Sequence, residues 1–412
     1  MQTVAIVGAS LAGLRAAETL RSEGFADQII LLGGEPYAPY NRPPLSKQFL
    51  TGEWAADRLS LRTTEQFDAL NLCFRPSTQA VALNVDERAI KLRDGSTVEF
   101  DGLVIATGAR AIQLPTLANR PGVYTLRTLD DSVALSRALN NAGSLVVIGG
   151  GFIGSEVAAS AHGMGIKTTI IESQSALMLR GLGITIGAAL TNFHRMQGID
   201  VRCDSTVTQV TDDGIRTSIE LSDGTSHTPD VILVGVGAVP VTDWLANSSI
   251  AIDNGVSCDS FCRVQSKLGE SITGIVAAGD VARWYSKRHQ RHVRSEHWTN
   301  AQDQGSAAAK TLLADLDDSR ATDCFYDPVP YMWSDQFGKK IQVVGFPEAS
   351  DTTHVVKGSL SDAKFLALIE RSGQLVGSIG MAMVPGLVQA RSLLNENASF
   401  DQALNAFAVQ KN

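Results

Sequence analysis

Two segments of this chain each have the pattern of a buried strand, a glycine-rich turn, a helix and a second buried strand. They are TVAIVGASLAGLRAAETLRSEGFADQIILLGG, residues 3–34, and SLVVIGGGFIGSEVAASAHGMGIKTTIIE, residues 144–172. The apolar runs are short and rich in β-branched residues, and the stretch between them has helical periodicity. Because parallel strands need a crossover connection, each segment predicts a parallel β-α-β unit. The sequence therefore predicts an α/β fold that contains two such units.

The turn of each unit carries a dinucleotide-binding fingerprint, in which glycines let the backbone approach a pyrophosphate. All three glycines are present in the second turn, whereas a serine replaces the second glycine in the first turn. The residues are Gly8, Ser10, Leu11, Ala12 and Gly13 in the first turn, and Gly149, Gly151, Phe152, Ile153 and Gly154 in the second. Taken alone, the first match could be only a tight strand-to-helix turn.

An acidic residue follows the second strand of each unit: Glu35 comes directly after the first segment, and Glu172 is the last residue of the second. Both lie about 20 residues after the last glycine, where a carboxylate accepts hydrogen bonds from ribose hydroxyls. Two fingerprints with two acids favour two bound dinucleotides, of which one flavin and one nicotinamide are the simplest pair. Because Glu172 would repel a 2′-phosphate, we expect a preference for NADH over NADPH.

Composition narrows the class of protein. A chain of 412 residues with 44% hydrophobic and 19% charged residues is expected to form two or three globular domains. A net charge of −8 argues against nonspecific nucleic-acid binding over the whole surface. No apolar stretch is long enough to span a bilayer, and a strand that begins at Thr3 leaves no room for a signal peptide. Cytoplasmic location without a membrane partner is expected.

The five cysteines are few, scattered and odd in number, which is typical of a reducing compartment. They are Cys73, Cys203, Cys258, Cys262 and Cys324. The spacing of Cys258 and Cys262 permits a metal site, but no second cluster or histidine pair accompanies them. Isolated structural cysteines are the favoured interpretation, and no metal is expected.

Three further apolar segments are expected to complete the two sheets. LVIATGARA (103–111) and VILVGVGAVP (231–240) each resemble a buried strand that closes one nucleotide-binding sheet. In the segment ITGIVAAGDVA (272–282), the apolar strand ends at Gly279 and Asp280. An aspartate at the carboxyl end of a strand faces the ligand crevice and can bond flavin ribityl hydroxyls. A helix cap is the alternative role of Asp280.

Together these motifs resemble the glutathione-reductase-like flavoproteins and, within them, the NADH-dependent ferredoxin reductases of oxygenase systems. The motifs that carry the resemblance are GASLAG, YNRPPLSK, ATGA, LRTLDD, GGGFIGSE, GVGAVP, AAGDVA, SEHWTNAQDQG and PVPYMWSDQFGKKIQVVG. They occur in the order of that family over essentially the whole chain. Ser10 is the departure from the pattern, and it leaves open the first phosphate contact and the affinity for FAD.

The resemblance implies two Rossmann-like domains and a C-terminal α+β domain. The FAD domain would comprise residues 1–113 and 245–322, the NADH domain 114–244 and the C-terminal domain 323–412. The polar stretch LLADLDDSRATD supports the last boundary. A monomer or a weak homodimer is expected.

The resemblance also assigns roles to single residues. Lys47 would lie near the reactive N5 edge of the flavin, and Arg42 would face the pyrophosphate. Glu156 would contact the nicotinamide carboxamide and pair with Lys47, although an ordinary first-turn glutamate is the alternative. Trp333 would lie near the flavin on the partner side or be a core residue. The remaining expected FAD or NADH contacts are Val81, Ala106, Thr107, Gly108, Arg127, Gly237, His297 and Trp298.

The positions of the cysteines bear on the reaction. Disulfide reductases of this superfamily carry a cysteine pair after the first ribose acid, whereas residues 1–72 contain no cysteine. Electrons from NADH would therefore pass through FAD to an external acceptor, by resemblance a [2Fe–2S] ferredoxin that feeds an oxygenase. A rubredoxin or another carrier, or a redox-sensing interaction protein of the apoptosis-inducing-factor type, are the alternatives.

The segment RWYSKRHQRHVR, residues 283–294, contains five Lys or Arg residues and no acid. We expect it to be a loop beside the flavin crevice that steers an acidic ferredoxin. A solvated loop that only serves solubility is the alternative.

Overall fold

The computed structural model describes residues 1–317, 319–320 and 325–408. The chain divides into two compact units, which are described separately below. Unit 1 comprises Met1–Asn41, Ala56–Arg110 and Val239–Pro328, and unit 2 comprises Arg42–Ala55, Ala111–Ala238 and Val329–Asn412. The expected domain boundaries near 113, 244 and 322 stay predictions, and residues 321–324 around the last of them lie outside the described residues.

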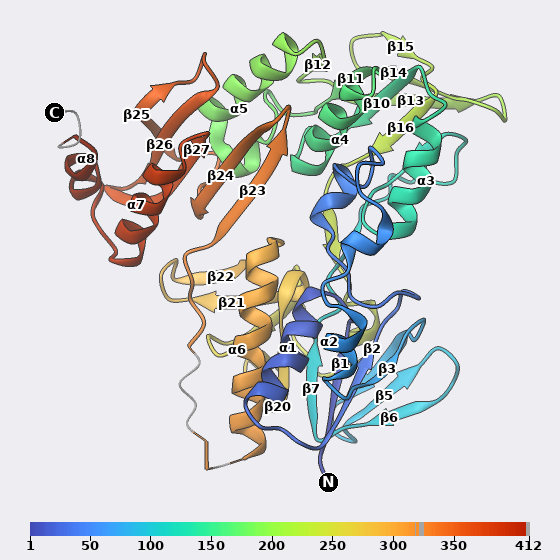
Figure 1. Cartoon of the computed structure of the whole chain (residues 1–412), viewed down its shortest axis with the longest axis vertical. Coiled ribbons are helices and arrows are strands. Elements are labelled where there is room, and N and C mark those ends of the chain that lie inside the picture. Colours follow the sequence, from blue (N-terminus) through green and yellow to red (C-terminus); the bar gives the residue numbers. More distant parts are fainter. Residues whose placement is uncertain (318, 321–324, 409–412) are drawn as a thin grey trace. The chain divides into compact units, whose positions relative to one another are not determined.

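Unit 1 is built around a sheet in the order β22-β21-β18-β19-β20-β7-β1-β2-β3 (Figure 1). Its strands are β1 (Thr3–Val7), β2 (Gln28–Leu32), β3 (Cys73–Arg75), β7 (Gly102–Ile105), β18 (Val256–Cys258), β19 (Arg263–Gln265), β20 (Ser271–Ala277), β21 (Ala282–Ser286) and β22 (Arg291–Arg294). A smaller sheet contains β4 (Ala80–Asn84), β5 (Ala89–Leu92) and β6 (Thr97–Glu99). The helices are α1 (Leu11–Ser22), α2 (Thr64–Asp68) and α6 (Trp298–Leu316), with 3₁₀ turns η2 (Ala56–Leu59), η3 (Asp243–Leu245) and η4 (Gly279–Val281).

The parallel strands at the centre of this sheet confirm the first predicted β-α-β unit. β1 pairs in parallel with β2 and β7, and β7 pairs in parallel with β20. β7 is buried along its whole length, as expected for a strand covered on both faces. Helices α1 and α6 pack closely, because a Cβ at Gly305 would lie 2.5 Å from the Ala12 carbonyl oxygen.

Unit 2 contains a second parallel sheet in the order β12-β11-β10-β16-β9. Its strands are β9 (Val123–Tyr124), β10 (Ser144–Ile148), β11 (Lys167–Ile171), β12 (Asp200–Arg202) and β16 (Val231–Val234). The helices of this part are α3 (Leu129–Leu139), α4 (Phe152–Gly163) and α5 (Leu179–Met196), together with the 3₁₀ turn η1 (Pro43–Ser46) and the small sheet β13 (Val207–Asp212), β14 (Thr217–Leu221) and β15 (Ser226–His227). This arrangement confirms the second predicted β-α-β unit. β8 (Ala109–Ala111) and β17 (Ala238–Pro240) lie where the chain passes between the units.

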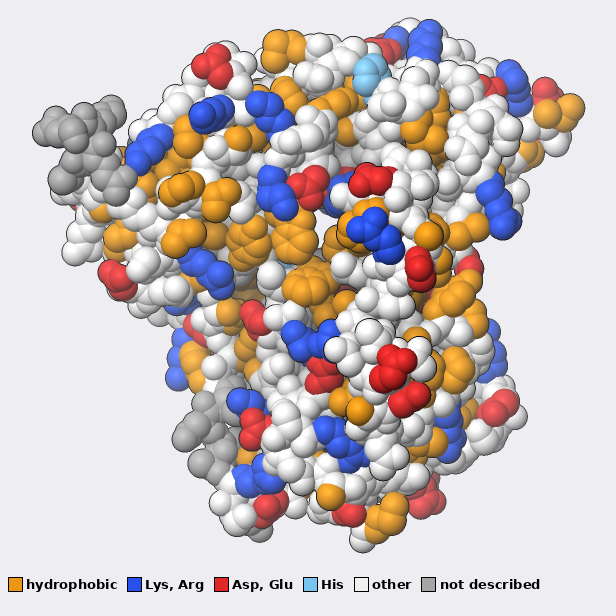
Figure 2. Space-filling view, in the orientation of Figure 1, with side chains coloured by type: hydrophobic (Ala, Val, Ile, Leu, Met, Phe, Trp, Pro, Cys, Tyr) orange, Lys and Arg blue, Asp and Glu red, His pale blue; other side chains and the backbone are white. Residues whose placement is uncertain are grey.

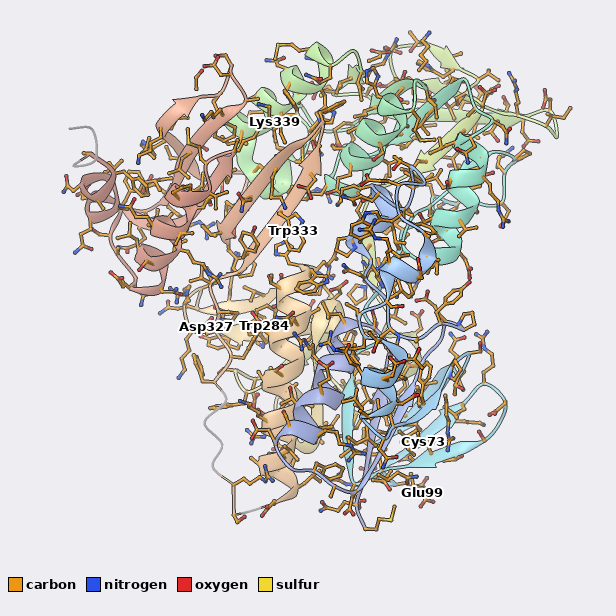
Figure 3. All side chains as sticks on the ribbon, in the orientation of Figure 1. Cys73, Glu99, Trp284, Asp327, Trp333 and Lys339 are labelled. Atoms are coloured by element: carbon orange, nitrogen blue, oxygen red, sulfur yellow. The ribbon has the colours of Figure 1, made fainter. Side chains whose placement is uncertain are left out.

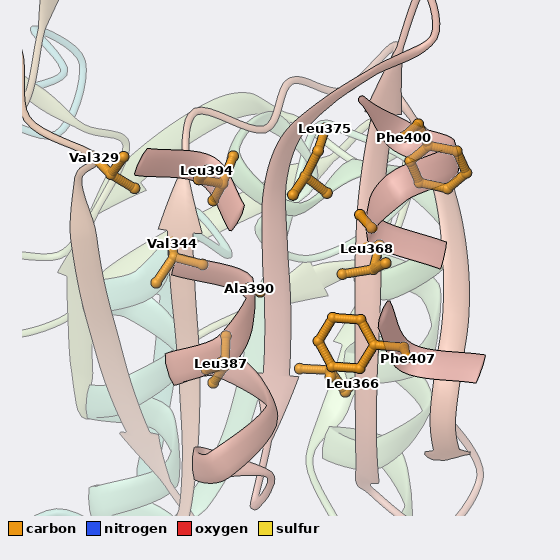
Figure 4. Packing of buried hydrophobic residues seen from close by; sticks show 11 residues of the cluster. Val329, Val344, Leu366, Leu368, Leu375, Leu387, Ala390, Leu394, Phe400 and Phe407 are labelled. Carbon is orange, nitrogen blue, oxygen red and sulfur yellow. The ribbon is translucent and has the colours of Figure 1, made fainter. Parts of the chain in front are cut away.

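The C-terminal part of unit 2 is an antiparallel sheet in the order β23-β24-β27-β26-β25, followed by two helices. The elements are β23 (Tyr331–Gln336), β24 (Lys339–Gly345), β25 (Thr352–Ser359), β26 (Lys364–Arg371), β27 (Gln374–Met381), α7 (Val384–Asn395) and α8 (Phe400–Ala408). Leu387 and Leu394 of α7 and Phe407 of α8 pack on Leu366 and Leu368 of β26 in one buried cluster (Figure 4). Strands followed by helices make this part α+β, as predicted.

One segment that was expected to be a loop forms strands, and another segment contains an ordered turn. Residues 283–294 form most of the antiparallel hairpin β21–β22, so the loop expected there was wrong. Alternating polar and apolar residues in WYS and HVR let the two strands pair while Trp284 and Val293 are buried. The YNRPPLSK segment contains η1, with Pro43 and Pro44 at its start, where fixed φ angles favour the turn.

None of the helices in the described part of the chain is both long and apolar enough to cross a bilayer.

Candidate functional site

The first fingerprint forms a tight turn between β1 and α1 in unit 1. Gly8 has a φ of +119°, and a Cβ there would lie 2.0 Å from the Ala106 carbonyl oxygen. A Cβ at Gly13 would lie 2.0 Å from the Gly8 carbonyl oxygen. Both positions therefore require glycine, and Ser10 between them is the extended N-cap residue of α1. The turn brings the N-terminus of α1 to the carboxyl end of β1, which is an anion-binding arrangement.

Glu35 follows β2 and is half-buried. Its carboxylate accepts a 2.6 Å hydrogen bond from the Tyr40 hydroxyl, a partner that the sequence did not suggest. This contact restrains the carboxylate at the end of the strand, where a ribose would be expected. Val81 lies on β4 and is 39% exposed.

Ala106, Thr107 and Gly108 follow β7 directly. The Thr107 hydroxyl donates a 2.7 Å hydrogen bond to the Val241 carbonyl oxygen and so holds this turn in place. Gly279 and Asp280 lie in η4 at the carboxyl end of β20, as predicted, and both are buried. The Gly279 amide donates a 2.9 Å hydrogen bond to Gln304 Oε1, which was not anticipated from the sequence.

His297 is the N-cap residue of α6, and Trp298 is the first residue of that helix. Burial lowers the pKa of His297 to about 4, against the opposing effect of Asp280. The ring is therefore neutral at pH 7, and its buried Nδ1 atom has no hydrogen-bond partner among the described residues. Trp298 Nε1 donates a 2.9 Å hydrogen bond to Asn41 Oδ1. An orphaned buried nitrogen beside a helix N-terminus suits a bound polar cofactor.

The second fingerprint, between β10 and α4 in unit 2, separates structural glycines from one glycine that faces open space. A Cβ at Gly149 would lie 2.5 Å from the Gly235 carbonyl oxygen, and one at Gly154 would lie 2.1 Å from the Gly149 carbonyl oxygen. A Cβ at Gly151 would meet nothing within 4 Å. The space before Gly151, at the N-terminus of α4, is where a pyrophosphate would approach the backbone. The residues present therefore fit a dinucleotide.

Phe152 is half-buried, and Ile153 is 42% exposed at the start of α4. Gly237 is exposed in the segment after β16 and has a φ of +123°. Phe152 and Ile153 therefore belong to the first turn of α4, whereas Gly237 lies between β16 and β17.

Glu172 follows β11 and is only 9% exposed. Its Oε2 atom accepts a 2.7 Å hydrogen bond from the Gly150 amide, and its Oε1 atom accepts from the Gln174 amide at 2.8 Å and from the Ser173 hydroxyl at 3.2 Å. A carboxylate offers about four acceptor sites, so roughly one remains for a ribose hydroxyl. The carboxylate is held rigidly beside the second fingerprint.

The Lys47–Glu156 ion pair suggested by the family resemblance is present in unit 2. Lys47 Nζ lies 2.9 Å from Glu156 Oε2, and the two side chains are 12% and 8% exposed. The Ser46 hydroxyl donates to Oε2 at 2.5 Å, the Ser334 hydroxyl to Oε1 at 2.7 Å and the Asp335 amide to Oε1 at 3.3 Å. The sequence had not assigned roles to these three additional donors. The sequence signal for Ser334 was its place on an expected strand two residues before Gln336, which puts both side chains on the same face of the sheet.

Arg42 and Arg127 also meet in unit 2. Arg42 Nη1 donates a 2.8 Å hydrogen bond to the Arg127 carbonyl oxygen, and the Arg127 amide donates to Asp131, which belongs to the capping box of α3. Trp333 lies on β23 (Figure 3), half-buried and stacked on Tyr331 with ring centroids 5.9 Å apart. Lys340 Nζ lies 5.8 Å from the Trp333 ring centroid.

A family model described as pyridine nucleotide-disulphide oxidoreductase matches residues 2–305, and one described as reductase C-terminal matches residues 331–408. The chain belongs to the pyridine nucleotide-disulphide oxidoreductases. This oxidoreductase is 34% identical to rhodocoxin reductase of Rhodococcus erythropolis, over 91% of this chain and 85% of that protein. It is 35% identical to the ferredoxin reductase component of chlorobenzene dioxygenase from Cupriavidus sp. (strain PS12), over 95% of this chain and 93% of that protein.

Among solved structures, the oxidoreductase is similar to putidaredoxin reductase in its covalent complex with putidaredoxin, with a TM-score of 0.89 and 28% identity over 99% of this chain and 98% of that one. The resemblance to ferredoxin reductases and the predicted fold class are thereby confirmed. The expectation that the oxidoreductase uses FAD and NAD(H) is confirmed as well. Four of its cysteines, Cys73, Cys203, Cys258 and Cys262, form no disulfide bond, and Cys324 lies outside the described residues.

Proposed function

We propose that this protein is an FAD-dependent NADH:ferredoxin oxidoreductase of an oxygenase system. The observation that carries the proposal is the absence of cysteine from residues 1–72, where disulfide reductases of the superfamily hold their redox pair. Reducing equivalents must then leave for an external acceptor. The ferredoxin reductases among the relatives point to a ferredoxin. One NADH would reduce two one-electron ferredoxin clusters and yield NAD⁺ and a proton.

Bound FAD supplies the chemistry that links a two-electron donor to one-electron acceptors. The chain contributes binding and orientation. In unit 2, the turn at Gly151 and the N-terminus of α4 would bind the NADH pyrophosphate, and Glu172 would accept from its ribose. Phe152, Ile153 and Gly237 would line the same nucleotide.

We propose that Lys47 and Glu156 act at the reacting rings. The Lys47 ammonium would stabilise negative charge that develops on the flavin, because it is held in a nearly buried ion pair. Glu156 keeps Lys47 in place and would orient the nicotinamide carboxamide. Since four donors already occupy the Glu156 carboxylate, a carboxamide N–H would have to share or replace one of them.

FAD would be bound by the first fingerprint and by the other elements of unit 1. Glu35 would accept from the adenosine ribose, and Asp280 from the ribityl chain. The N-terminus of α6 carries no acidic residue in its first turn, so its amides at Trp298 would stabilise negative charge on the flavin ring. By the family resemblance, Arg42 would face the FAD pyrophosphate and Arg127 would contact FAD. Val81, Ala106, Thr107, Gly108 and His297 would be further contacts.

The partner would be an acidic [2Fe–2S] ferredoxin, which Trp333 would meet on the partner side of the flavin. We also propose that the protein is cytoplasmic and that it is a monomer or a weak homodimer.

Steady-state turnover of the FAD-loaded protein with NADH and purified ferredoxins, rubredoxin and ferricyanide tests the function. We expect ferredoxin reduction at many turnovers per second, within the usual range for enzymes. Rapid rubredoxin reduction with little ferredoxin reduction would assign the other carrier. Slow reduction of every protein acceptor would favour a redox-sensing interaction protein.

A further inference from the structure

A buried chain of hydrogen bonds runs from helix α5 through strand β23 to the carboxylate of Glu156, all within unit 2. His194 Nε2 lies 2.7 Å from Gln336 Oε1, Gln336 Nε2 donates to the Ser334 hydroxyl at 2.9 Å, and Ser334 donates to Glu156 Oε1 at 2.7 Å. The three side chains beyond Glu156 are 0–1% exposed. Because water does not compete for these buried donors and acceptors, each hydrogen bond is stronger than it would be at the surface.

The direction of donation along this chain is determined by its chemistry. Gln336 Oε1 can only accept, so His194 must carry its proton on Nε2. Burial lowers the pKa of His194 to about 4, which keeps the ring neutral at pH 7. Every donor in the series therefore points toward the Glu156 carboxylate. His194 is also surrounded by the rings of Phe193 and Phe337, with centroids 6.2 and 5.1 Å away, which restrict its rotation.

The second carboxylate oxygen of Glu156, Oε2, contacts the YNRPPLSK segment. Glu156 Oε2 accepts from Ser46 and pairs with Lys47. The same segment is tied down by the Ser132 hydroxyl, which donates to the Leu45 carbonyl oxygen at 2.7 Å, and by the Ser160 hydroxyl, which donates to the Ser46 carbonyl oxygen at 2.8 Å. Glu156 is thus the junction between the C-terminal sheet and the lysine-bearing turn.

We propose that Ser334, Gln336 and His194 are positioning residues that hold Glu156, and through it Lys47, in the geometry needed for hydride transfer from NADH. The inference rests on the proposed function of the Lys47–Glu156 pair. It gives the C-terminal domain a role in the NADH half-reaction, in addition to any role in receiving a partner. The role follows from a contact between residues 178 positions apart in the sequence.

The decisive variant is Ser334→Ala in the FAD-loaded protein. It removes the hydroxyl that links Gln336 to Glu156 and leaves Oε1 with only the longer Asp335 contact. NADH-dependent ferricyanide reduction should lose about tenfold in kcat, as expected for about one charge-assisted hydrogen bond, with KM for NADH changed less than about twofold. Gln336 is one hydrogen bond further from Glu156. Gln336→Met should therefore also lower kcat with little change in KM for NADH, but the loss of kcat should be smaller than in Ser334→Ala.

Ser378→Ala is the matched control. Ser378 is 0% exposed in β27 of the same sheet, and its hydroxyl donates a 2.7 Å hydrogen bond to the Ala367 carbonyl oxygen, away from Glu156. The control removes the same atom at the same burial. We expect its kcat to stay within about twofold of the parent protein, since no contact to the Glu156 junction is lost.

Amide hydrogen exchange without NADH gives a second readout. Ser334→Ala should speed exchange in residues 42–50, where the Leu45 and Lys47 amides donate to Arg42 and Pro44 carbonyl oxygens, while other segments keep their rates. The proposal is overturned if exchange there is unchanged, if it rises evenly over the whole chain, or if kcat falls equally in Ser378→Ala. Ferricyanide needs no ferredoxin, so an error in the proposed protein acceptor would leave this result standing.

Discussion

Lys47 is the residue to which we assign the positive charge beside the reacting rings. Its ammonium is nearly buried against Glu156, and η1 precedes it with two prolines that restrict the backbone. Lys47→Met keeps the length and the apolar stem of the side chain. Glu156 would still accept from Ser46, Ser334 and the Asp335 amide, so the variant should fold.

Lys47→Met should slow reduction of the flavin by NADH by roughly 10–100-fold, because a positive charge near the reacting ring is lost. Stopped-flow absorbance of the flavin measures this rate directly. Lys364→Met, at an exposed position on β26, is the control and should leave the rate unchanged. An unaltered rate in Lys47→Met would mean that Lys47 only fastens its own turn.

Glu172 makes a prediction about the choice of nucleotide. Hydrogen bonds from the Gly150 and Gln174 amides prevent its carboxylate from swinging away from the second fingerprint. A 2′-phosphate would meet a fixed negative charge there. We expect kcat/KM for NADPH to be lower than for NADH by roughly 100-fold, equivalent to about 2.7 kcal/mol. Glu172→Gln should reduce the difference in kcat/KM between NADH and NADPH. Comparable kcat/KM values for the two nucleotides in the parent protein would refute the role of Glu172 at the ribose.

At the scale of the elements, the glycines of the β10–α4 turn have different roles: Gly151 leaves space for a ligand, and Gly154 is needed for folding. Gly151 has φ −72° and ψ −175°, which other residues adopt readily, and its missing Cβ faces open space. Gly151→Ala should therefore fold normally and raise KM for NADH by about tenfold, because the methyl group would occupy the path of the pyrophosphate.

Gly154→Ala should impair folding rather than nucleotide binding alone, since its Cβ would lie 2.1 Å from the Gly149 carbonyl oxygen. We expect a lower Tm or a lower yield of folded protein. Gly163→Ala, at the end of the same helix with nothing within 4 Å, is the control and should be neutral or slightly stabilising. Equal KM values in the Gly151 variant and the control would show that the nucleotide binds elsewhere.

At the scale of the whole molecule, the net charge of −8 contrasts with the basic segment 283–294. On the face shown in Figure 2, cationic and acidic side chains are interspersed. Part of the charge on the segment is neutralised, because Arg283 pairs with Asp253 and Arg294 with Glu296. Lys287 and Arg291 are exposed at the turn of the β21–β22 hairpin, which makes them the cations best placed to attract an acidic partner.

Replacing Lys287 and Arg291 together by glutamate should reduce ferredoxin-dependent turnover several-fold at low ionic strength and less at high salt, while ferricyanide reduction is retained. The matched control replaces the exposed Arg137 and Lys167 by glutamate and changes the net charge equally. If both double variants behave alike, only total charge matters. If neither changes the ferredoxin rate and salt has no effect, the hairpin takes no part in docking.

The sequence by itself determined the features that depend on local pattern. Apolar runs, helical periodicity and fingerprint glycines predicted both β-α-β units and located β1 and β10 at their observed places. Gly154 could be recognised because the Gly149 carbonyl oxygen, in the same β-α-β segment, leaves no room for a side chain there. The family resemblance added Lys47 and Glu156, since neighbouring motifs carried them.

Only the tertiary structure decided which residues distant in sequence are linked to the Lys47–Glu156 ion pair by hydrogen bonds. Ser334, Gln336 and His194 read as an unremarkable strand serine, glutamine and helix histidine until β23 and α5 pack beside α4 and create the hydrogen-bonded chain. The hairpin at 283–294 was missed for a related reason, because charge suggested a loop while cross-strand pairing and burial of Trp284 imposed strands. Local pattern specifies elements, whereas the partners of a buried polar group depend on which elements the fold brings together.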